Sequence, residues 1–517
     1  MIDMTHTFRR FVGPFMMAAL GLLIATGCAT TGSSTASETA AATAPQQDVD
    51  PRAHVVRVTV TSQPFDYIRP WRKKQPGTRQ GIGVVLAGGD ILVTARLVED
   101  ATYVELENML ESEKGPAEVA FVDYNANLAL LRPTEPDVMR GLLPVAISPT
   151  VAVGDAATTW QFEDNGTPFL TEGTVRTIDL GGYPYGNMAY MVYNVEMSLT
   201  QGGSSFTIPV VKDGRLLGIL MGYNSNTKIM QLVAAPVIQH FLDDKADGTY
   251  DGFPSGGFSV ASLEDSQLRN YVGIGDMAFN GGVYVSYVRP GSAAAKAGLT
   301  KGDVLVSVGG FPIDKHGEFD DAEYGKMSLS FLTTTRSHVG QSLPLQVLRD
   351  GQPVEITMVL EREVLDSYPV LPYEFDVQPE YIIVGGMIFQ ELNRQMLQEW
   401  GSGYQTKAPN RLVYMEEHQW ELFEPGQRQV LLTHTLPTAY TNGYTQFNFL
   451  PLTKANGKDI HSIHDLAAAL KAPLDGFHKF EFQEQPYTMY MEAELVAPLN
   501  EAIQNLYKLP AMENLRH

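Results

Sequence analysis

The sequence contains a single cysteine, Cys28, among 517 residues. One cysteine excludes a disulfide within the chain, so the folded part depends on hydrophobic cores large enough to hold without crosslinks. Basic residues are also scarce: 37 Lys and Arg stand against 59 Asp and Glu, a formal net charge of −22. This balance disfavours binding to nucleic acid, or to anionic lipid through a basic face, because both need clustered cations.

Short motifs that bind metals, phosphate or dinucleotides are missing as well. The sequence has no zinc-type His/Cys spacing, no G-x-x-x-x-G-K segment and no G-x-G-x-x-G fingerprint between a strand and a helix. We therefore expect no metal and no cofactor. The apolar fraction of 44% and the aromatic fraction of 10% are those of ordinary folded domains.

The one long apolar run lies at the start of the chain. Residues 1–27 pass from Arg9 and Arg10 through FVGPFMMAALGLLIA to small residues. This is the composition of a secretory signal peptide, and Gly and Pro interrupt it too often for a membrane span. The following ATGC resembles the cleavage box of bacterial lipoproteins, with Ala25 where leucine is usual. We expect lipidation at Cys28; the alternative is cleavage near Ala29 and a freely soluble protein.

Residues 28–50 are rich in Ser, Thr, Ala and Gln and hold almost no large apolar side chains. Such a segment cannot bury enough surface to fold, so it is expected to be a flexible, lipidated tether. Ala29, directly after the cysteine, resembles the sorting signal of lipoproteins sent to the outer membrane. The predicted location is the bacterial cell envelope, with the chain lipid-anchored and facing the periplasm.

Residues 51–248 consist of short β-branched and aromatic runs broken by Gly and Asp turns, such as HVVRVTVTS, ILVTARLV and MAYMVYNVEM. Repeated short strands of this kind predict an all-β sandwich or barrel. The KDG turn between IPVV and RLLGIL predicts a hairpin, and VIQHFLDD predicts a helix at the end of the region.

Three stretches of this region resemble the active site of the Deg/HtrA serine proteases: GIGVVLAGGDILVTARLVED (81–100), FVDYNANLALLRP (121–133) and MSLTQGGSSFTIPVVKDGRLLGIL (197–220). The resemblance implies a chymotrypsin-like double β-barrel. It places Arg96 at the catalytic histidine, Asn127 at the orienting aspartate, and Ser204 at the nucleophile behind Gly202 and Gly203 of the oxyanion loop. The two glycines and the proline that normally follow the nucleophile are absent.

These replacements argue against catalysis. A guanidinium has a pKa of about 12.5 or more and offers only donors, so Arg96 cannot take the Ser204 proton. An amide at the aspartate position costs about 10⁴ in turnover even when the histidine is present. The histidines between residues 51 and 250 are His54 and His240, and we expect neither beside Ser204. Arg96 is then either a fixed cation for a peptide carboxylate or a member of a structural ion pair.

Residues 249–366 have a different sequence pattern from the strand-rich region before them. The segment GGVYVSYVRPGSAAAKAGLTKGDVLVSVGGFPID (281–314) resembles a PDZ domain of the Deg/HtrA type, with a helix at 293–297, Gly298 at its end and a strand after Asp303 whose valines and leucine are buried. The peptide-binding loop is expected in SGGFSV, whose backbone N–H groups would hold a terminal carboxylate. The residues concerned are Gly256, Gly257, Phe258, Ser259 and Val260. The alternative is a glycine-rich linker.

Residues 367–517 resemble the second PDZ-like domain of the plant-type Deg branch. The segments that carry this resemblance are YIIVGGMIFQELNRQMLQEWG (381–401), with a strand before a helix, and PLTKANGKDIHSIHDLAAAL (451–470), with a turn before a helix; QLRNYVG (267–273) resembles the same branch. The expected fold class is thus mostly β: a chymotrypsin-like double β-barrel followed by two PDZ-like α+β domains.

The resemblance implies an assembly, trimeric or larger, that binds peptide or unfolded-protein clients through PDZ domains. With the cutting residues replaced, we predict a pseudoprotease that acts as a chaperone-like or scaffolding subunit. One alternative is an active periplasmic serine endopeptidase of protein quality control with Ser204 as nucleophile. Another is a regulatory subunit that assembles with an active Deg paralogue. A serine in a glycine-rich turn is also common without any catalytic role.

Overall fold

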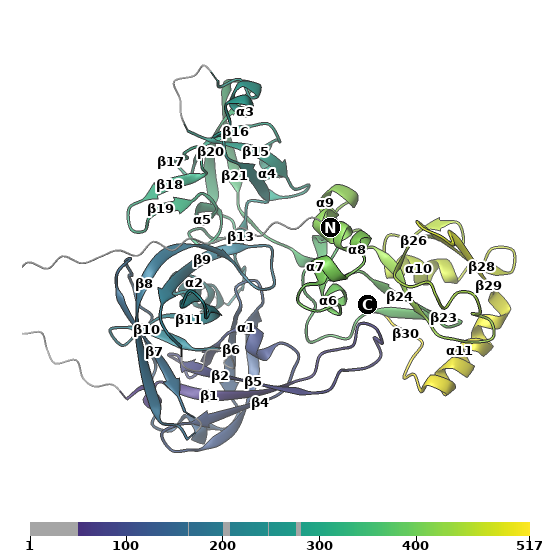
Figure 1. Cartoon of the computed structure of the whole chain (residues 1–517), viewed down its shortest axis with the longest axis horizontal. Helices are drawn as coiled ribbons and strands as arrows, with labels where there is room; N and C mark the ends of the chain where they lie inside the picture. Colours follow the sequence, from purple (N-terminus) through teal and green to yellow (C-terminus); the bar gives the residue numbers. More distant parts are fainter. Residues whose placement is uncertain (1–49, 164, 200–206, 247, 276–280, 517) are drawn as a thin grey trace, which may run out of the picture. The chain divides into compact units, whose positions relative to one another are not determined.

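The computed structural model describes residues 50–163, 165–199, 207–246, 248–275 and 281–516. The predicted signal peptide, Cys28 and almost all of the predicted tether lie outside these ranges, as do Gly202, Gly203 and Ser204. Two closed six-stranded barrels are followed by sheets with flanking helices, which confirms the predicted fold class (Figure 1). Within the described ranges no helix is long and apolar enough to cross a membrane.

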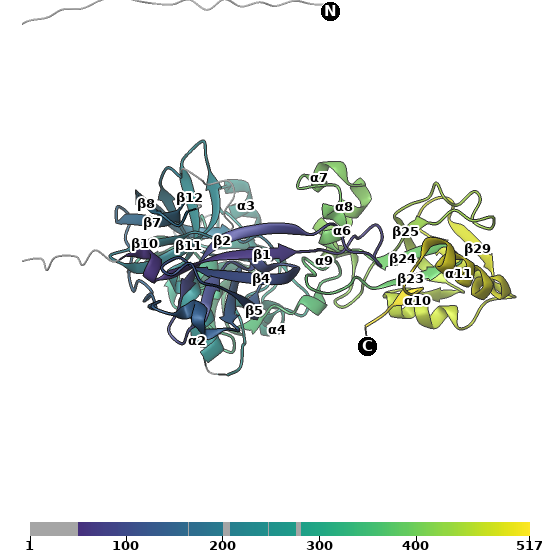
Figure 2. The same cartoon turned by 90° about the horizontal axis from the view of Figure 1, so that it is seen from below.

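The first barrel is built on alternating valines. In β1 these residues point inward from one face and Arg57 and Thr59 stay partly exposed, the pattern of a half-buried strand. The barrel closes in the order β1 (Val55–Ser62), β2 (Gly77–Val85), β3 (Ile91–Val93), β6 (Leu128–Pro133), β5 (Lys114–Asp123) and β4 (Ala101–Asn108). Figure 2 shows β1 between β2 and β4, with which it pairs antiparallel.

The prediction of a strand over ILVTARLV is wrong in its second half. Strand β3 ends at Val93, and the helix α1 (Ala95–Val98) begins after Thr94. The reason is tertiary: the carbonyl and the side chain of Asn127 accept the N–H groups of Ala95 and Arg96, which turns the chain out of the sheet.

The second barrel closes in the order β10 (Pro209–Lys212), β11 (Arg215–Asn224), β12 (Ile229–Ala234), β9 (Ala189–Glu196), β8 (Pro168–Gly182) and β7 (Ala156–Phe162). The predicted hairpin is confirmed between β10 and β11, where Asp213 and Gly214 both have positive φ, as a two-residue hairpin turn requires. The predicted terminal helix is α2 (Ala235–Ala246). Short 3-10 turns, η1 (Pro51–Ala53) and η2 (Pro136–Met139), precede β1 and follow β6.

A sheet with a capped helix follows the barrels. Its strands are β14 (Phe258–Ala261), β15 (Val283–Val288), β16 (Val304–Val308), β20 (Ser342–Arg349) and β21 (Gln352–Val359), with β17 (Phe311–Pro312) on β16. Its helices are α3 (Ser266–Tyr271), α4 (Ala293–Ala297) and α5 (Ser330–Thr333). The pairs β13 (Pro254–Ser255) with β22 (Glu361–Arg362) and β18 (Glu318–Asp321) with β19 (Gly325–Ser328) complete it.

The predicted helix and its stop are confirmed here. Helix α4 spans Ala293–Ala297, is capped by the Ser292 side chain, and ends at Gly298 with φ of +86°. Asp303 precedes β16 and its buried carboxylate pairs with Arg349, which also donates to the Gly298 carbonyl. The one departure is Val306, which is only half-buried. The K-G-D turn thus joins the end of α4 to β20.

The last sheet runs β29 (Thr488–Glu492), β28 (Phe477–Phe482), β26 (Leu450–Ala455), β25 (Val430–Thr435), β24 (Met387–Glu391), β23 (Tyr381–Val384) and β30 (Glu513–Asn514), with β27 (Lys458–Asp459) on β26. The two predicted helices after strands are α6 (Arg394–Gln398) and α10 (Ile463–Leu470). The other helical segments are η3 (Leu365–Ser367), α7 (Tyr404–Lys407), α8 (Asn410–Glu417), α9 (Gln419–Leu422) and α11 (Ala493–Tyr507).

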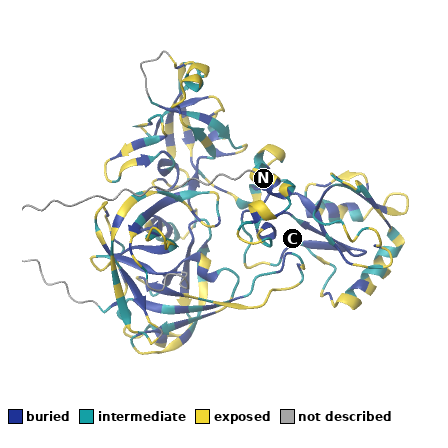
Figure 3. Cartoon of the chain, viewed as in Figure 1, coloured by how far each residue is buried: buried dark blue, intermediate teal, exposed yellow. Residues whose placement is uncertain are grey.

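The strands are buried along their inner faces, and exposed residues gather in loops and on the outer faces of helices (Figure 3). The connection between β1 and β2, residues 63–76, is an exception because part of it is buried in the last domain. We call it the β1–β2 arm. Tyr67 is 5% exposed and joins the cluster of Leu392, Met396 and Leu412, while Trp71 packs edge-on against Tyr381.

Candidate functional site

The residues predicted at the histidine and aspartate positions are neighbours. The backbone N–H of Arg96 donates to the side-chain oxygen of Asn127 over 3.1 Å. Asn127 is 1% exposed and has φ of +53°, a left-handed conformation that asparagine tolerates. The Arg96 side chain is exposed. Asn127 therefore acts as a local clamp on α1, and its amide oxygen is already engaged.

The chain re-enters the described region beside these residues. Thr207, the first described residue after 200–206, accepts the backbone N–H of Thr94 at 3.0 Å through its hydroxyl, which lies 2.8 Å from the Thr94 hydroxyl. The carbonyl of Thr207 accepts the N–H of Ile82. Thr207 therefore contacts Thr94, which precedes Arg96 by two residues, while Ser204 itself lies outside the described residues.

Aromatic side chains cover the surface near Arg96. Tyr124 and Tyr185 pack against Phe375 with ring centroids 4.8 and 4.9 Å away, and Tyr373 lies 5.4 Å from Tyr124. The Tyr185 hydroxyl donates to Glu99; burial and then the Glu99 charge raise the pKa of Tyr185, while the Arg96 charge opposes the shift. A segment from beyond the first PDZ-like sheet therefore packs against Tyr124 and Tyr185, close enough to Arg96 for its charge to act on Tyr185.

The histidines of the barrels have other surroundings. His54 follows η1, and its Nδ1 lies 3.0 Å from the carbonyl oxygen of Leu143. His240 belongs to α2 and stacks between Phe253 and His338 at centroid distances of 4.2 and 4.3 Å. Neither has a described contact with Arg96 or Asn127.

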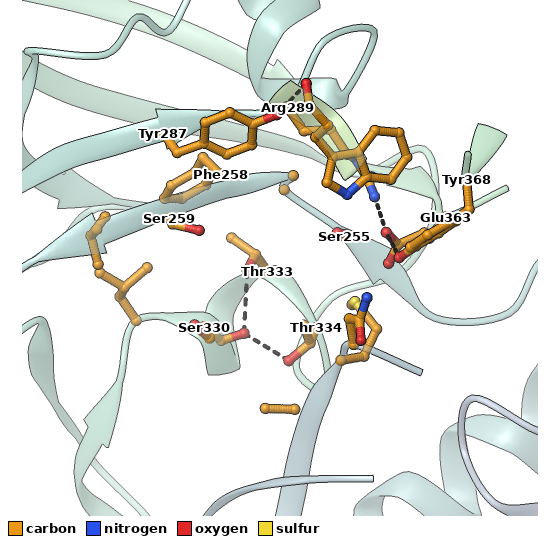
Figure 4. Close-up of a pocket in the computed structure, with 18 of the residues that line it drawn as sticks. Ser255, Phe258, Ser259, Tyr287, Arg289, Ser330, Thr333, Thr334, Glu363 and Tyr368 are labelled. Carbon is orange, nitrogen blue, oxygen red and sulfur yellow. Dashed lines mark hydrogen bonds and ion pairs between the residues drawn. The ribbon is translucent and has the colours of Figure 1, made fainter. Parts of the chain in front are cut away.

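A groove of about 560 Å³ lies between β14 and α5 (Figure 4). All five residues of the predicted peptide-binding loop line it, so this segment is a structured wall and not a free linker. Phe258 and Ser259 of β14 face Ser330, Thr333 and Thr334 from the α5 side. The hydroxyls of Thr333 and Thr334 donate to the Ser330 carbonyl, which keeps this wall compact.

The loop before β14 is oriented by its own carbonyl groups. The Gly256 carbonyl accepts the Ala294 N–H, and the Gly257 carbonyl accepts the Arg289 N–H and the Ser292 hydroxyl. Since the C=O and N–H of a peptide unit point in opposite directions, the N–H groups of Gly257 and Phe258 are directed away from α4. Gly257 has φ of +71°, and a Cβ there would lie 2.3 Å from the Ser292 Cβ, so only glycine fits.

The polar end of the groove is acidic. Arg289 lines it, but its guanidinium is paired with the buried Glu363 and lies 5.1 Å from the Trp420 ring centroid. Burial lowers the pKa of Arg289 from its ordinary value. Glu417 and Glu421, from the last domain, also line this end. A ligand carboxylate would meet a neutralised arginine among carboxylates, which favours an extended segment over a free chain terminus.

The comparisons agree with this architecture. Two family models described as PDZ domain match residues 370–513 and 284–326. Protease Do-like 2, chloroplastic, of Arabidopsis thaliana is 26% identical over 464 residues, covering 88% of this chain and 74% of the relative. The periplasmic serine endoprotease DegP of Escherichia coli (strain K12) is 24% identical over 294 residues, covering 54% of this chain and 57% of the relative.

The chain is similar in sequence to proteases of the Deg/HtrA family, and two of its regions match PDZ domains. Among solved structures, an HtrA-type protease AlgW with decapeptide is 19% identical, with a TM-score of 0.44 over 60% of this chain and 97% of that one.

Several residues that line the groove could not be identified from the sequence. The α5 wall lies in SLSFLTTT (328–335), a short polar and apolar mixture with no helical periodicity to find it by. Met188, from the second barrel, and Trp420, from the last domain, also line the groove. Both residues lie far from β14 in the sequence, so no local sequence pattern indicates that they line the same groove.

Proposed function

We propose that this Deg/HtrA chain captures extended segments of misfolded or unfolded proteins in the groove between β14 and α5, and that it does so without cleaving them. The observation that carries the proposal is the open outer edge of β14. Among the described residues β14 pairs with β15 alone, and its other edge borders the groove. An added strand gains main-chain hydrogen bonds there and needs no catalytic group.

The loss of cleavage follows from the chemistry at Arg96 and Asn127. A serine hydroxyl needs a neighbouring base during attack, and neither a guanidinium nor an amide can accept that proton. Asn127 also holds the Arg96 backbone, so it does not position a base for Ser204. The aromatic cover over Tyr124 and Tyr185 further supports a cleft that does not admit substrates.

The remaining parts of the proposal concern place and assembly. In this proposal the chain is lipidated at Cys28 and faces the periplasm from the outer membrane. The composition of residues 1–50 supports this location. It forms a homo-oligomer of three or more copies. As a second role, it joins an active Deg paralogue as a regulatory subunit, a role that a capture groove without a catalytic base would suit.

Client capture is tested by filling the groove. Ser330→Trp places a large ring opposite Ser259, so we expect binding of fluorescein-labelled unfolded casein to weaken by about tenfold or more, measured by anisotropy. Ser342→Trp, at an exposed position on β20, is the matched control and should bind like the wild type. Equal binding by both variants and the wild type would refute capture in this groove.

Inactivity is tested on the same purified chain. We expect no hydrolysis of casein and no labelling by a fluorophosphonate probe, which needs an activated serine. Hydrolysis or labelling that disappears in Ser204→Ala would instead establish the active endopeptidase.

A further inference from the structure

The β1–β2 arm concentrates positive charge in a chain that is acidic as a whole. Residues 69–74 are RPWRKK, so four of six side chains are basic and none is acidic, whereas the formal net charge of the chain is −22. All four basic residues are exposed. The N–H of Arg72 donates to the Arg69 carbonyl at 2.9 Å, which closes a turn that carries both arginines. The acidic average of the chain therefore does not describe this turn.

Residues of this turn and of the last domain line a common pocket of about 700 Å³. This volume is in the range of binding sites for small organic molecules. The pocket has an apolar floor: Ile388 and Leu436 are buried in the cluster that contains Tyr381, and Trp71 packs against the same cluster. Tyr507, which is 37% exposed, adds an aromatic ring to the lining. An apolar ligand group would find a preformed surface here.

The carboxylates that line the pocket are already paired. Asp66 contacts the Nε of Arg69 at 3.0 Å, and Glu399 contacts the Nζ of Lys74 at 2.7 Å. The two acidic side chains are 12% and 15% exposed, whereas Arg69 and Lys74 are 56% and 42% exposed. The cations therefore lie nearer to solvent than their partners, and a negatively charged ligand group would meet them first.

Hydrogen-bond donors remain for such a group. Three basic and two acidic residues line the pocket, so one cation is in excess. That cation is Arg72: in the part of the chain that the structure describes, its side chain has no hydrogen-bond or ion-pair partner, and Arg69 is engaged through its Nε alone. A guanidinium carries five N–H donors in a planar fork that matches the oxygens of a phosphate or a carboxylate.

We propose that this pocket binds a single-chain amphiphile with a phosphate or carboxylate head. Its alkyl chain lies against Trp71 and Leu436. Arg69 and Arg72 hold its anionic group. Because Leu436 is only 8% exposed, the alkyl chain reaches it as a free molecule and not from within a bilayer. The pocket is separate from the groove between β14 and α5 and does not depend on the function proposed for that groove.

The probe is decyl phosphate, titrated into the full chain below its critical micelle concentration and followed by calorimetry. Inorganic phosphate should bind about 100-fold more weakly or worse, because each buried methylene group contributes about fourfold in affinity. Decanol, which has the same alkyl chain without the charge, should bind about tenfold more weakly or worse. Equal affinities for decanol and decyl phosphate, or no binding of decyl phosphate, would overturn the proposal.

The contribution of the basic turn is tested at an exposed position, where the fold tolerates a change. Arg72→Glu should weaken decyl phosphate binding about tenfold or more at low salt. Arg215→Glu, at an exposed arginine of β11, changes the net charge of the chain by the same amount and should bind like the wild type. Equal losses in the two variants would show a general effect of net charge and contradict the site.

The position of the ligand is tested with Trp71, one of four tryptophans in the chain. Decyl phosphate should change the tryptophan emission of the wild type and leave that of Trp71→Phe unchanged, although calorimetry still detects binding to this variant. An emission change that survives in Trp71→Phe, or bound ligand without any change in the wild type, would place the ligand elsewhere.

Vesicles of phosphatidylglycerol test the other source of an anionic head group. If they bind the wild type more tightly than Arg72→Glu while decyl phosphate does not bind, the basic turn contacts a membrane surface and the proposed pocket ligand is wrong. Ser330→Trp should bind decyl phosphate like the wild type, which separates a failure here from a failure of the groove between β14 and α5.

Discussion

At the scale of single residues, Arg96 and Asn127 stand at the positions predicted for the catalytic histidine and aspartate, and their neighbours show what Asn127 does in the fold. Asn127 uses its side chain to hold the Arg96 backbone and its own carbonyl to hold Ala95. Because these bonds hold the start of α1, between β3 and β4, Asn127 has a structural role in this turn. The Arg96 side chain is exposed.

Another residue-scale feature makes stability depend on pH. His240 is 5% exposed and stacked between two rings; burial, and then the nearby His338, lower its pKa below the ordinary value of 6.5. Between pH 7 and pH 5 the His240 imidazole therefore binds a proton more readily in the unfolded chain than in the folded chain. The free energy of unfolding should therefore fall as pH drops from 7 to 5, by at most about 1.4 kcal/mol per pH unit.

We expect His240→Phe to reduce this loss, since phenylalanine keeps the ring contact without a proton site. The measurement is the urea midpoint at pH 7.5 and pH 5.5. Burial lowers the pKa of His478 too, so part of the slope remains. His461→Gln, at an exposed position, is the control. If His240→Phe and the wild type lose the same stability on acidification, the assignment is wrong.

At the scale of elements, the β1–β2 arm shows how a connection becomes part of another domain's core. Besides its buried ring, Tyr67 offers a carbonyl that accepts from Gln390 and a hydroxyl that donates to Glu374. Lys74 pairs with Glu399 at 2.7 Å. The arm is thus held at its middle and at its end, by contacts that no local pattern in residues 63–76 predicts.

Removing the Tyr67 ring tests this anchoring. Tyr67→Ala should cost about 3 kcal/mol or more, as for other buried aromatic residues, and raise the opened population of the arm about 100-fold. Limited proteolysis within residues 63–76 measures that population. Tyr103→Ala, at a tyrosine that is 50% exposed on β4, should cost less than about 0.5 kcal/mol. Similar cleavage of both variants would show that Tyr67 anchors nothing.

At the scale of the whole molecule, Glu374 joins segments from distant parts of the chain. Its carboxylate accepts from Asn393 at 2.9 Å and pairs with Arg516, and its carbonyl accepts from the Tyr67 hydroxyl. One residue further on, Phe375 covers the aromatic residues near Arg96. Residues 374 and 375 therefore connect the segment that contains Arg516 with the aromatic side chains near Arg96.

Local order in the sequence was enough to predict much of this protein. Alternating valines define β1, and a left-handed glycine ends α4. These features depend on neighbours in sequence, where periodicity and turn chemistry act directly. The order of motifs similarly predicted barrels followed by PDZ-like domains.

Only the tertiary structure decided which strand edges are open and which are filled. Nothing in YIIV or MENLR says that they pair, and nothing in the arm says that Tyr67 enters a distant core. The turn at Ala95 was missed for the same reason, because its bonds come from Asn127. Such contacts form between residues far apart in sequence, whose meeting depends on the packing of the entire chain rather than on local preference.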